Sequence, residues 1–231
     1  MQLIPNGTFL MGSVGWGEFE GPVREVFLGP FRMDDAPVTN QEFSAFTRQT
    51  GYRTTAEIKG FARGYEQGEI KEIRGLSWKT YFTEERADHP VVLVSWHDAA
   101  AFAQWAGKRL PMEAEWEKAA RGGLEQKLYP WGDNPPDALR CNFGRQTVDM
   151  PPTTAIRSFA PNAYGLYDMA GNVWQWCSDW FSETAATKVR RGASFNIMQA
   201  FRLRCANRGA FKPDDFAINI GFRCVKDTDH D

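Results

Sequence analysis

The sequence is poor in the residues that hold metal ions or carry redox chemistry. Its 231 residues include only 3 histidines and 4 cysteines. No Cys-x-x-Cys pair occurs, which argues against a zinc ribbon and a thioredoxin-type redox pair. No His-x-x-x-His or His-x-Glu pattern occurs either, so we do not expect a histidine-rich zinc or iron site built from this chain alone.

The sequence also lacks an excess of charge of one sign and any long apolar run. Lys and Arg number 27 against 29 for Asp and Glu, a net charge of −2, whereas general nucleic-acid binders show a basic excess. No stretch approaches the ~18 apolar residues of a membrane helix. Residues 1–10 lack the basic start and apolar run of a secretory signal. We expect a cytoplasmic protein with no nucleic-acid or membrane partner; a processed secreted form is the alternative.

The cysteines and histidines that are present look structural. Four reduced and mostly buried thiols are expected in a cytosol. A disulfide such as Cys141 to Cys205 is the alternative, and sequence spacing cannot decide it. A hydrolase triad needs a base, usually histidine. His89 precedes a proline and His97 lies in the first turn of a predicted helix, so scaffold roles are expected for both.

Three helices are predicted from capping signals and apolar periodicity. Thr39 and Glu42 form a capping box at the start of the first helix. Ser95 and Asp98 stand in the same relation at the start of the second. The third runs over about residues 113–121 after a methionine, which is a poor N-cap.

The remainder of the chain alternates short apolar pieces with turn residues, which favours loops and short strands. The segment 60–88, rich in Gly, Glu and Lys, is expected to be an exposed excursion. No linker divides the chain, so residues 1–231 are predicted to form one α+β domain. Strands are expected over residues 8–11, 25–28, 91–94, 189–191, 201–206 and 221–225.

Two groups of oxygen-bearing residues are candidates for a hard cation such as calcium. One combines Asn172, the carbonyl of Val173 and Gln175; the other includes Asn142 and Asp149. The alternative is that the asparagines tie turns together through bonds from side chain to backbone.

An aromatic run starts at Trp174. Alternation places Trp174 and Trp176 on the same side of an extended segment. Core packing is one interpretation of these two rings, and the wall of a groove for a peptide or sugar is the other.

Nine segments spread over nearly the whole chain form a recognisable series. They are Gly7–Ser13, Pro37–Phe43, Gly51–Glu57, His89–Ala99, Gly107–Glu117, Tyr129–Gly132, Asn162–Trp176, Arg191–Phe195 and Asn219–Cys224. Together and in this order they resemble the family of formylglycine-generating enzymes, also called sulfatase-modifying factors. The resemblance implies a single compact α+β domain related to C-type lectins, with little regular secondary structure.

The family's metal chemistry does not carry over. Its enzymes oxidise a sulfatase cysteine to formylglycine, using two copper-binding cysteines just after a Gly-Gly-Ser-Trp/Tyr segment. In this chain Arg191-Gly-Ala-Ser-Phe resembles that segment, and the two positions are Ile197, or a neighbour, and Ala200. Copper(I) needs soft thiolate ligands. Copper and copper-dependent formylglycine generation are therefore not expected.

Other positions of the family's pocket are retained by resemblance. Ser194 matches the pocket serine, and Arg208 and Asn219 match polar groups at its floor, so these three are the predicted catalytic set. Trp176 matches a tryptophan of the substrate groove, and we place Asn196 beside it as a substrate contact.

The family's calcium positions match at Asn142, Asn172 and Val173. The usual glutamate is replaced by Gln175, so a structural calcium is expected only with that reservation.

Two further arginines are predicted to bind substrate. Arg202 and Arg204, with Arg208 nearby in sequence, are expected to clamp a carboxylate, because guanidinium binds carboxylate in bidentate fashion. The alternative is that Arg202 and Arg204 occupy strand positions facing solvent or an internal acid.

The resemblance and the missing cysteines lead to one functional expectation. We expect a divergent family member, of oxidoreductase type or another biosynthetic enzyme, that modifies or helps to modify an amino acid, peptide or small metabolite. Its catalytic metal is left open and a protein partner is expected. One alternative is a non-catalytic lectin-like module that binds a ligand or protein. The other is a subunit that completes a partner's iron-dependent oxidase site.

Overall fold

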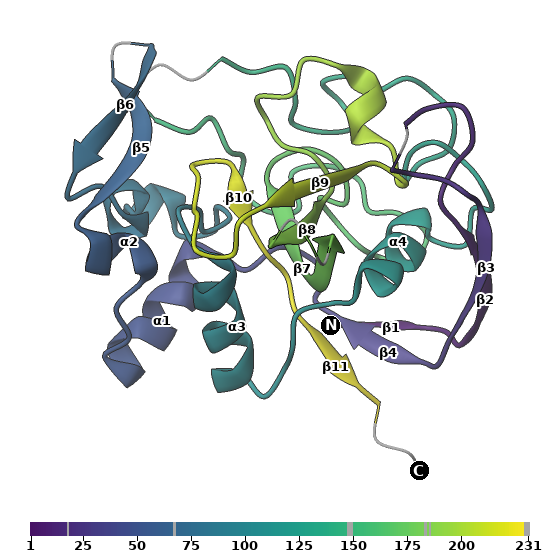
Figure 1. The fold of residues 1–231 in the computed structure, drawn as a ribbon, viewed down its shortest axis with the longest axis horizontal. Helices are drawn as coiled ribbons and strands as arrows, with labels where there is room; N and C mark the ends of the chain where they lie inside the picture. Colours follow the sequence, from purple (N-terminus) through teal and green to yellow (C-terminus); the bar gives the residue numbers. More distant parts are fainter. Residues whose placement is uncertain (18, 67, 147–149, 183, 185, 229–231) are drawn as a thin grey trace.

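A four-stranded sheet lies at the centre of the molecule, in the order β10-β7-β8-β9 (Figure 1). The structure is a computed structural model that describes residues 1–231 except 18, 67, 147–149, 183, 185 and 229–231. Strand β10 runs parallel to β7, and the other pairs are antiparallel. The strands are β7 (Trp174–Ser182), β8 (Thr187–Arg191), β9 (Arg208–Phe211) and β10 (Ile220–Gly221).

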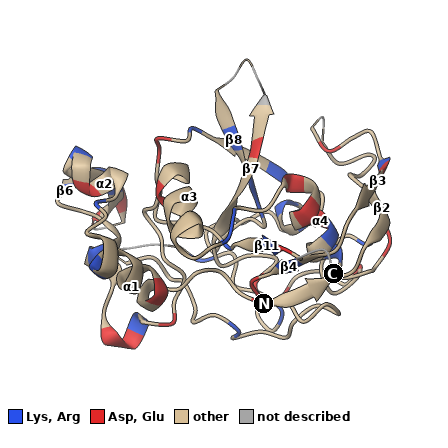
Figure 2. Ribbon diagram, turned by 90° about the horizontal axis from the view of Figure 1, so that it is seen from below, with Lys and Arg blue, Asp and Glu red and all other residues tan. Residues whose placement is uncertain are grey.

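Helices cover both sides of this sheet. Helices α3 and α4 lie on opposite sides of β7 and β8, and α1 and α2 lie on the α3 side (Figures 1 and 2). The two predicted capping boxes, at Thr39 and Ser95, are confirmed. At α4 the Met112 amide donates instead to Glu115 Oε2 at 2.8 Å. None of the helices in the described part of the chain is long and apolar enough to cross a membrane. The bounds are α1 (Asn40–Thr50), α2 (Thr55–Lys59), α3 (Trp96–Trp105) and α4 (Glu113–Arg121).

Smaller sheets and single turns surround this centre. Strand β4 is flanked by β1 and β11, so strands from both ends of the chain share one small sheet (Figure 1). Hairpins β2–β3 and β5–β6 lie at opposite ends of the molecule. The elements are β1 (Gln2–Ile4), β2 (Gly7–Met11), β3 (Arg24–Leu28), β4 (Phe31–Met33), β5 (Phe61–Glu66), β6 (Glu69–Arg74), β11 (Val225–Asp227), and the 3₁₀ turns η1 (Trp78–Tyr81), η2 (Glu84–Arg86) and η3 (Ala200–Leu203).

The segment 60–88 is exposed along much of its length, as predicted, but it is also anchored in the core. It forms the β5–β6 hairpin and then buries Leu76, Trp78 and Tyr81. The short helix α2 in front of it was also not predicted, although Thr54 and Glu57 form a capping box there. The polar composition of the segment gave no indication that these apolar residues are buried.

Two predicted strands are absent for different reasons. In segment 91–94 the amides of Val91 and Leu93 donate to Val38 and Ala217, which belong to two separate segments, so no ladder forms. In segment 201–206 the chain turns through η3. The strands predicted over residues 8–11, 25–28 and 189–191 are confirmed, and 221–225 is divided between β10 and β11.

Aromatic rings fill the core on the α1 and α3 side of the sheet. The Phe43 ring lies 5.2 Å from Trp78, 5.8 Å from Phe102 and 6.3 Å from Phe222, centroid to centroid. Trp174 belongs to the same cluster. Tilted and edge-on ring pairs contribute about 0.5–1.5 kcal/mol beyond burial. The tryptophan-rich composition therefore serves mainly the scaffold.

All four cysteines are buried and free. Burial raises the pKa of Cys141 and of Cys205 to about 12, and it raises the pKa of Cys177 and Cys224 well above the ordinary thiol value. The predicted state, four reduced and buried thiols, agrees with this arrangement.

A buried ion network joins α4 to the central sheet. Glu117, with 1% exposure, accepts hydrogen bonds from Arg121 and from Arg191 of β8, and also from the amide of Gly12. The Arg191 guanidinium, which is fully buried, also donates to the carbonyls of Ala206 and Asn207. Figure 2 shows the charged residues of α4 beside those of β8. A buried charge is tolerated only when it is paired in this way.

Removing the central carboxylate should destabilise the fold strongly. In Glu117→Gln the buried guanidinium of Arg191 loses the nearer of its two carboxylate partners and keeps only Glu113, at 3.6 Å. Breaking a buried ion pair in this way costs about 3–5 kcal/mol. Urea unfolding should show a lower midpoint with an unchanged slope. The control Glu125→Gln, at an exposed position, should stay within about 0.5 kcal/mol of the wild type. Equal midpoints for the two variants would contradict the role assigned to Glu117.

The buried thiols should be unreactive in the native state. Because the thiolate is the reactive form and burial raises every thiol pKa, iodoacetamide at pH 8 should label none of the four cysteines in native protein. After unfolding without reductant, mass spectrometry should find all four labelled. If only two were labelled after unfolding, a disulfide would be present.

Candidate functional site

Ser194, Asn196 and Asn219 form one polar cluster, as the predicted pocket requires. Ser194 Oγ donates to Asn196 Oδ1 at 2.8 Å. Asn219 Nδ2 donates to Asn196 Oδ1 at 3.0 Å and to Ser194 Oγ at 3.2 Å. Ser194 is fully buried, whereas the two asparagines are partly exposed. The cluster therefore has an open side from which a ligand can reach amide groups.

The central sheet brings these residues together. Ser194 follows the end of β8, and Asn219 directly precedes β10. The amide of Trp174 donates to the Asn219 carbonyl at 2.9 Å, which fixes Asn219 at the edge of β7. None of the three side chains titrates near neutral pH. The cluster can recognise a ligand by hydrogen bonding, but it offers no general acid or base.

Trp176 lies in the core and not on a groove surface. Its ring is fully buried and its Nε1 donates to the Val94 carbonyl at 3.2 Å. The ring lies 6.1 Å from Phe211, centroid to centroid. As predicted, Trp174 and Trp176 belong to one strand in alternating positions, but the core interpretation describes both better than a groove wall.

The predicted three-arginine clamp does not assemble. Arg204 is buried and donates to both carboxylate oxygens of Glu20 at 2.7 Å. Arg208 donates to both oxygens of Glu113 at 2.6 and 2.7 Å. Each of these two guanidiniums already holds a carboxylate. Arg202 alone of the three is exposed and has no ion pair with a described residue.

Arg190 was not among the predicted residues, although it lies on the central sheet close to the aromatic residues of β7 and β9. In the antiparallel register Arg190 of β8 is opposite Trp176 of β7 and Gly209 of β9, so its side chain leaves the same face as Trp176. Its guanidinium carbon lies 4.7 Å from the Trp174 ring centroid and 4.9 Å from that of Phe211. The only sequence pattern that could have pointed to Arg190 was the two-residue alternation of side chains along β8.

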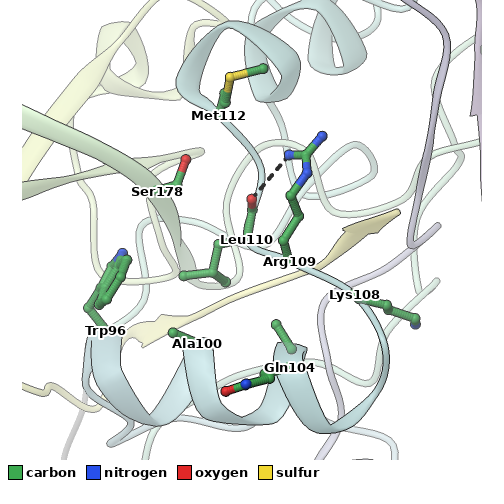
Figure 3. Close-up of a pocket in the computed structure, with 9 residues that line it drawn as sticks. Trp96, Ala100, Gln104, Lys108, Arg109, Leu110, Met112 and Ser178 are labelled. Carbon is green, nitrogen blue, oxygen red and sulfur yellow. Dashed lines mark hydrogen bonds between the residues drawn. The ribbon is translucent and has the colours of Figure 1, made fainter. Parts of the chain in front are cut away.

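A separate cavity of about 520 Å³ lies between α3, β7 and the segment that leads into α4. Figure 3 shows Trp96 and Ala100 of α3 on one side, with Ser178 and Met112 on the others. Its wall is mostly apolar. None of the predicted site residues is among those lining it, which are Trp96, Ala100, Ala103, Gln104, Lys108, Arg109, Leu110, Met112 and Ser178.

The asparagines of the candidate calcium sites tie turns together. Asn172 Oδ1 accepts from the Thr154 amide at 3.0 Å, and Asn172 Nδ2 donates to the Thr154 carbonyl at 3.1 Å. Asn142 Nδ2 donates to the Pro152 carbonyl at 2.8 Å and to Asn172 Oδ1 at 3.3 Å. This is the turn-tying alternative. Asp149 lies outside the described residues.

The Gln175 position does not fit a cation. Gln175 Oε1 accepts from Trp116 Nε1 at 2.8 Å and from Arg223 Nε at 2.7 Å. A buried guanidinium next to this oxygen repels calcium, and calcium prefers carboxylate ligands. Val173 is fully buried beside it. Within the described chain no group of three or more His, Cys, Asp or Glu side chains is placed to hold a metal ion.

The histidines have scaffold contacts. His89 Nδ1 lies 2.9 Å from Thr153 Oγ1, and burial together with the charge of Arg86 lowers the pKa of His89. The exposed His97 lies 3.3 Å from Asp214. His230 lies outside the described residues.

Known proteins with similar sequences agree with the family resemblance of this chain. The formylglycine-generating enzyme of Thermomonospora curvata is 40% identical over 282 aligned positions, which cover 98% of this chain and 93% of that protein. The alignment is longer than this chain, so some of its positions have no residue here. The inactive Cα-formylglycine-generating enzyme 2 of Bos taurus is 38% identical, covering 97% of this chain and 87% of that protein.

Solved structures and a family model give the same assignment. The structure of PvdO from Pseudomonas aeruginosa superposes with a TM-score of 0.77 at 26% identity, covering 98% of this chain and 93% of that one. The model of the sulfatase-modifying factor enzyme 1-like domain matches residues 1–228. The chain therefore belongs to the sulfatase-modifying factor family, the family of the formylglycine-generating enzymes.

Proposed function

We propose that this chain takes part in modifying an amino acid, peptide or small metabolite in a biosynthetic pathway, and that it is not a copper-dependent formylglycine-generating enzyme. One observation carries the proposal: the polar cluster of Ser194, Asn196 and Asn219 is assembled, while the positions that resemble the copper pair, Ile197 or a neighbour and Ala200, hold no cysteine. The site keeps the means to bind a ligand and lacks the thiolates of the family's chemistry.

The residues present do not fit copper. The side chains of Ile197 and Ala200 have no donor atoms, and the one soft ligand beside them, the thioether of Met198, is a single ligand where the family uses a pair of thiolates. The four cysteines are all buried, and Cys205, the one nearest in sequence, belongs to the core cluster on the α4 side of the sheet. No step of a reaction is therefore routed through copper.

The cluster is suited to an amide-bearing ligand. Asn196 and Asn219 present amide groups that both donate and accept, and such groups pair with the amide of an amino acid or peptide. Each hydrogen bond of this kind contributes about 0.5–1.5 kcal/mol, and more is lost when a buried partner is left unpaired. Recognition by several such bonds is specific without a titrating residue.

Two of the earlier expectations enter the proposal, and a third does not. A protein partner that supplies the reacting metal is proposed, because the cluster itself has no acid, base or thiolate. The cytoplasm is the proposed location. Calcium is not part of the proposal, because Gln175 Oε1 already accepts from Arg223.

A non-catalytic binding module is the second candidate. The 38% identity to a protein named as an inactive formylglycine-generating enzyme favours it. The two candidates differ in one observable: a modifying protein yields a product from its ligand, alone or with its partner, and a binding module does not.

The copper reaction should be absent. Purified chain incubated with Cu(I), oxygen and a synthetic peptide carrying a sulfatase cysteine should leave the peptide mass unchanged, whereas a formylglycine-generating enzyme assayed in parallel should convert it. Metal analysis should find less than one copper per chain after gel filtration. Formylglycine in the peptide would overturn the proposal.

Ligand binding should depend on Asn219. A panel of N-acetylated amino-acid amides is screened by the rise in melting temperature that binding causes by mass action. For the best binder, Asn219→Ala should weaken affinity about tenfold, as the loss of one to two hydrogen bonds predicts. Gln49→Ala, at an exposed position of α1, is the matched control. Equal affinity of the two variants would place the ligand elsewhere.

A further inference from the structure

Arg190 has a guanidinium that is held firmly but has no anionic partner. The group lies between the rings of Trp174 and Phe211, at 4.7 and 4.9 Å from their centroids. Guanidinium groups contact aromatic rings through the faces of their plane, so the N–H groups at the edge of the plane stay free to bind. Its Nε is buried and has no hydrogen-bond partner in the described part of the chain.

The sheet makes room for this side chain. Gly209 of β9 is opposite Arg190 in the register. A Cβ at position 209 would lie 3.0 Å from Arg190 Nε and 3.3 Å from Trp174 Cζ3. Any residue larger than glycine at position 209 would displace the guanidinium of Arg190 from its contact with the rings.

Arg202, in the η3 turn, is a second positive charge that acts on Arg190. Burial, and after it the charge of Arg202, lowers the pKa of Arg190 to about 10. Neither guanidinium forms an ion pair with a carboxylate of the described residues, although Arg191, Arg204 and Arg208 each do so. Two unpaired guanidiniums that repel each other are stabilised by an anion between them.

Arg190 is connected to the polar cluster through two short routes. Trp174, whose ring Arg190 contacts, donates its amide to the carbonyl of Asn219. Arg190 lies in β8, which ends at Arg191, and Ser194 follows three residues after that end. Arg202 is exposed and Arg190 is partly so, which leaves an approach from solvent.

We propose that Arg190 and Arg202 bind an oxyanion, a carboxylate or a phosphoryl group, of the ligand whose amide is held by Asn196 and Asn219. This inference rests on the proposed function, which supplies the amide-bearing ligand. It adds that the same ligand carries an anionic group. It replaces the predicted clamp of Arg202, Arg204 and Arg208 with a pair in which only Arg202 is retained.

The alternative is that Arg190 only packs against the two rings. Arg190→Met keeps the stem and the stacking contact and removes the charge, so it separates packing from anion binding. Arg202→Gln removes the second charge at an exposed position and provides the test even if the first variant folds poorly. Arg63→Gln, exposed on the β5–β6 hairpin, is the control for the loss of one positive charge.

The experiment titrates N-acetylglycine, inorganic phosphate and the neutral N-acetylglycinamide at constant ionic strength set with KCl, and measures dissociation constants by calorimetry. N-acetylglycine, phosphate or both should bind the wild type and Arg63→Gln alike. Binding should be at least tenfold weaker in Arg190→Met and in Arg202→Gln. Binding of N-acetylglycine alone identifies a carboxylate site, and binding of phosphate alone identifies a phosphoryl site.

Two results would overturn the inference. In the first, neither oxyanion gives a binding signal above that of KCl at the same ionic strength. In the second, the wild type and both site variants bind the oxyanions equally. Neither result affects the proposed function, because that is tested by the absence of formylglycine and by the effect of Asn219→Ala on neutral amides. Conversely, formylglycine formation with intact oxyanion binding would overturn the proposed function alone.

Discussion

The fold depends on neutralising charge inside its centre. Helix α4 places Glu113 and Glu117 against the sheet, and the arginines of β8, β9 and α4 itself surround them. Because an unpaired buried ion costs several kcal/mol, each of these arginines is committed to a carboxylate. The constraint also affects a residue predicted to be catalytic: Arg208 is held by Glu113 and cannot serve a ligand without breaking that pair. Arg190 leaves the other face of the same sheet and has no such carboxylate partner among the described residues.

Features that depend on neighbours in sequence were predictable, and those that depend on distant partners were not. The capping boxes at Thr39 and Ser95 lie within four residues, and both helices begin where expected. The strand predicted over 91–94 failed because its amides meet carbonyls from two remote segments. The pocket residues Ser194 and Asn219 came from family resemblance, and their contact agrees with it. Whether an arginine forms an ion pair depends on acidic residues far away in the sequence, such as Glu20 for Arg204. No local sequence pattern reveals such partners.

In the proposed function the copper ligands are lost while the architecture stays intact. The cluster of Ser194, Asn196 and Asn219 is held by the sheet and by bonds among its own members, and none of these bonds depends on a metal. A site that keeps its hydrogen-bonding groups and gives up its redox ligands can still select a ligand. The chemical step then has to come from a metal or group supplied from outside these residues, or not occur at all.

The small sheet β1-β4-β11 has a consequence for how the chain is made. Strand β4 is synthesised early and pairs with β11, which is among the last residues of the described chain. During translation one edge of β4 stays unpaired until β11 has left the ribosome, and exposed strand edges invite pairing with other chains. Contacts between such distant segments also form slowly. The nascent protein therefore passes through a long interval in which protection by a chaperone would matter more than the stability of the finished fold.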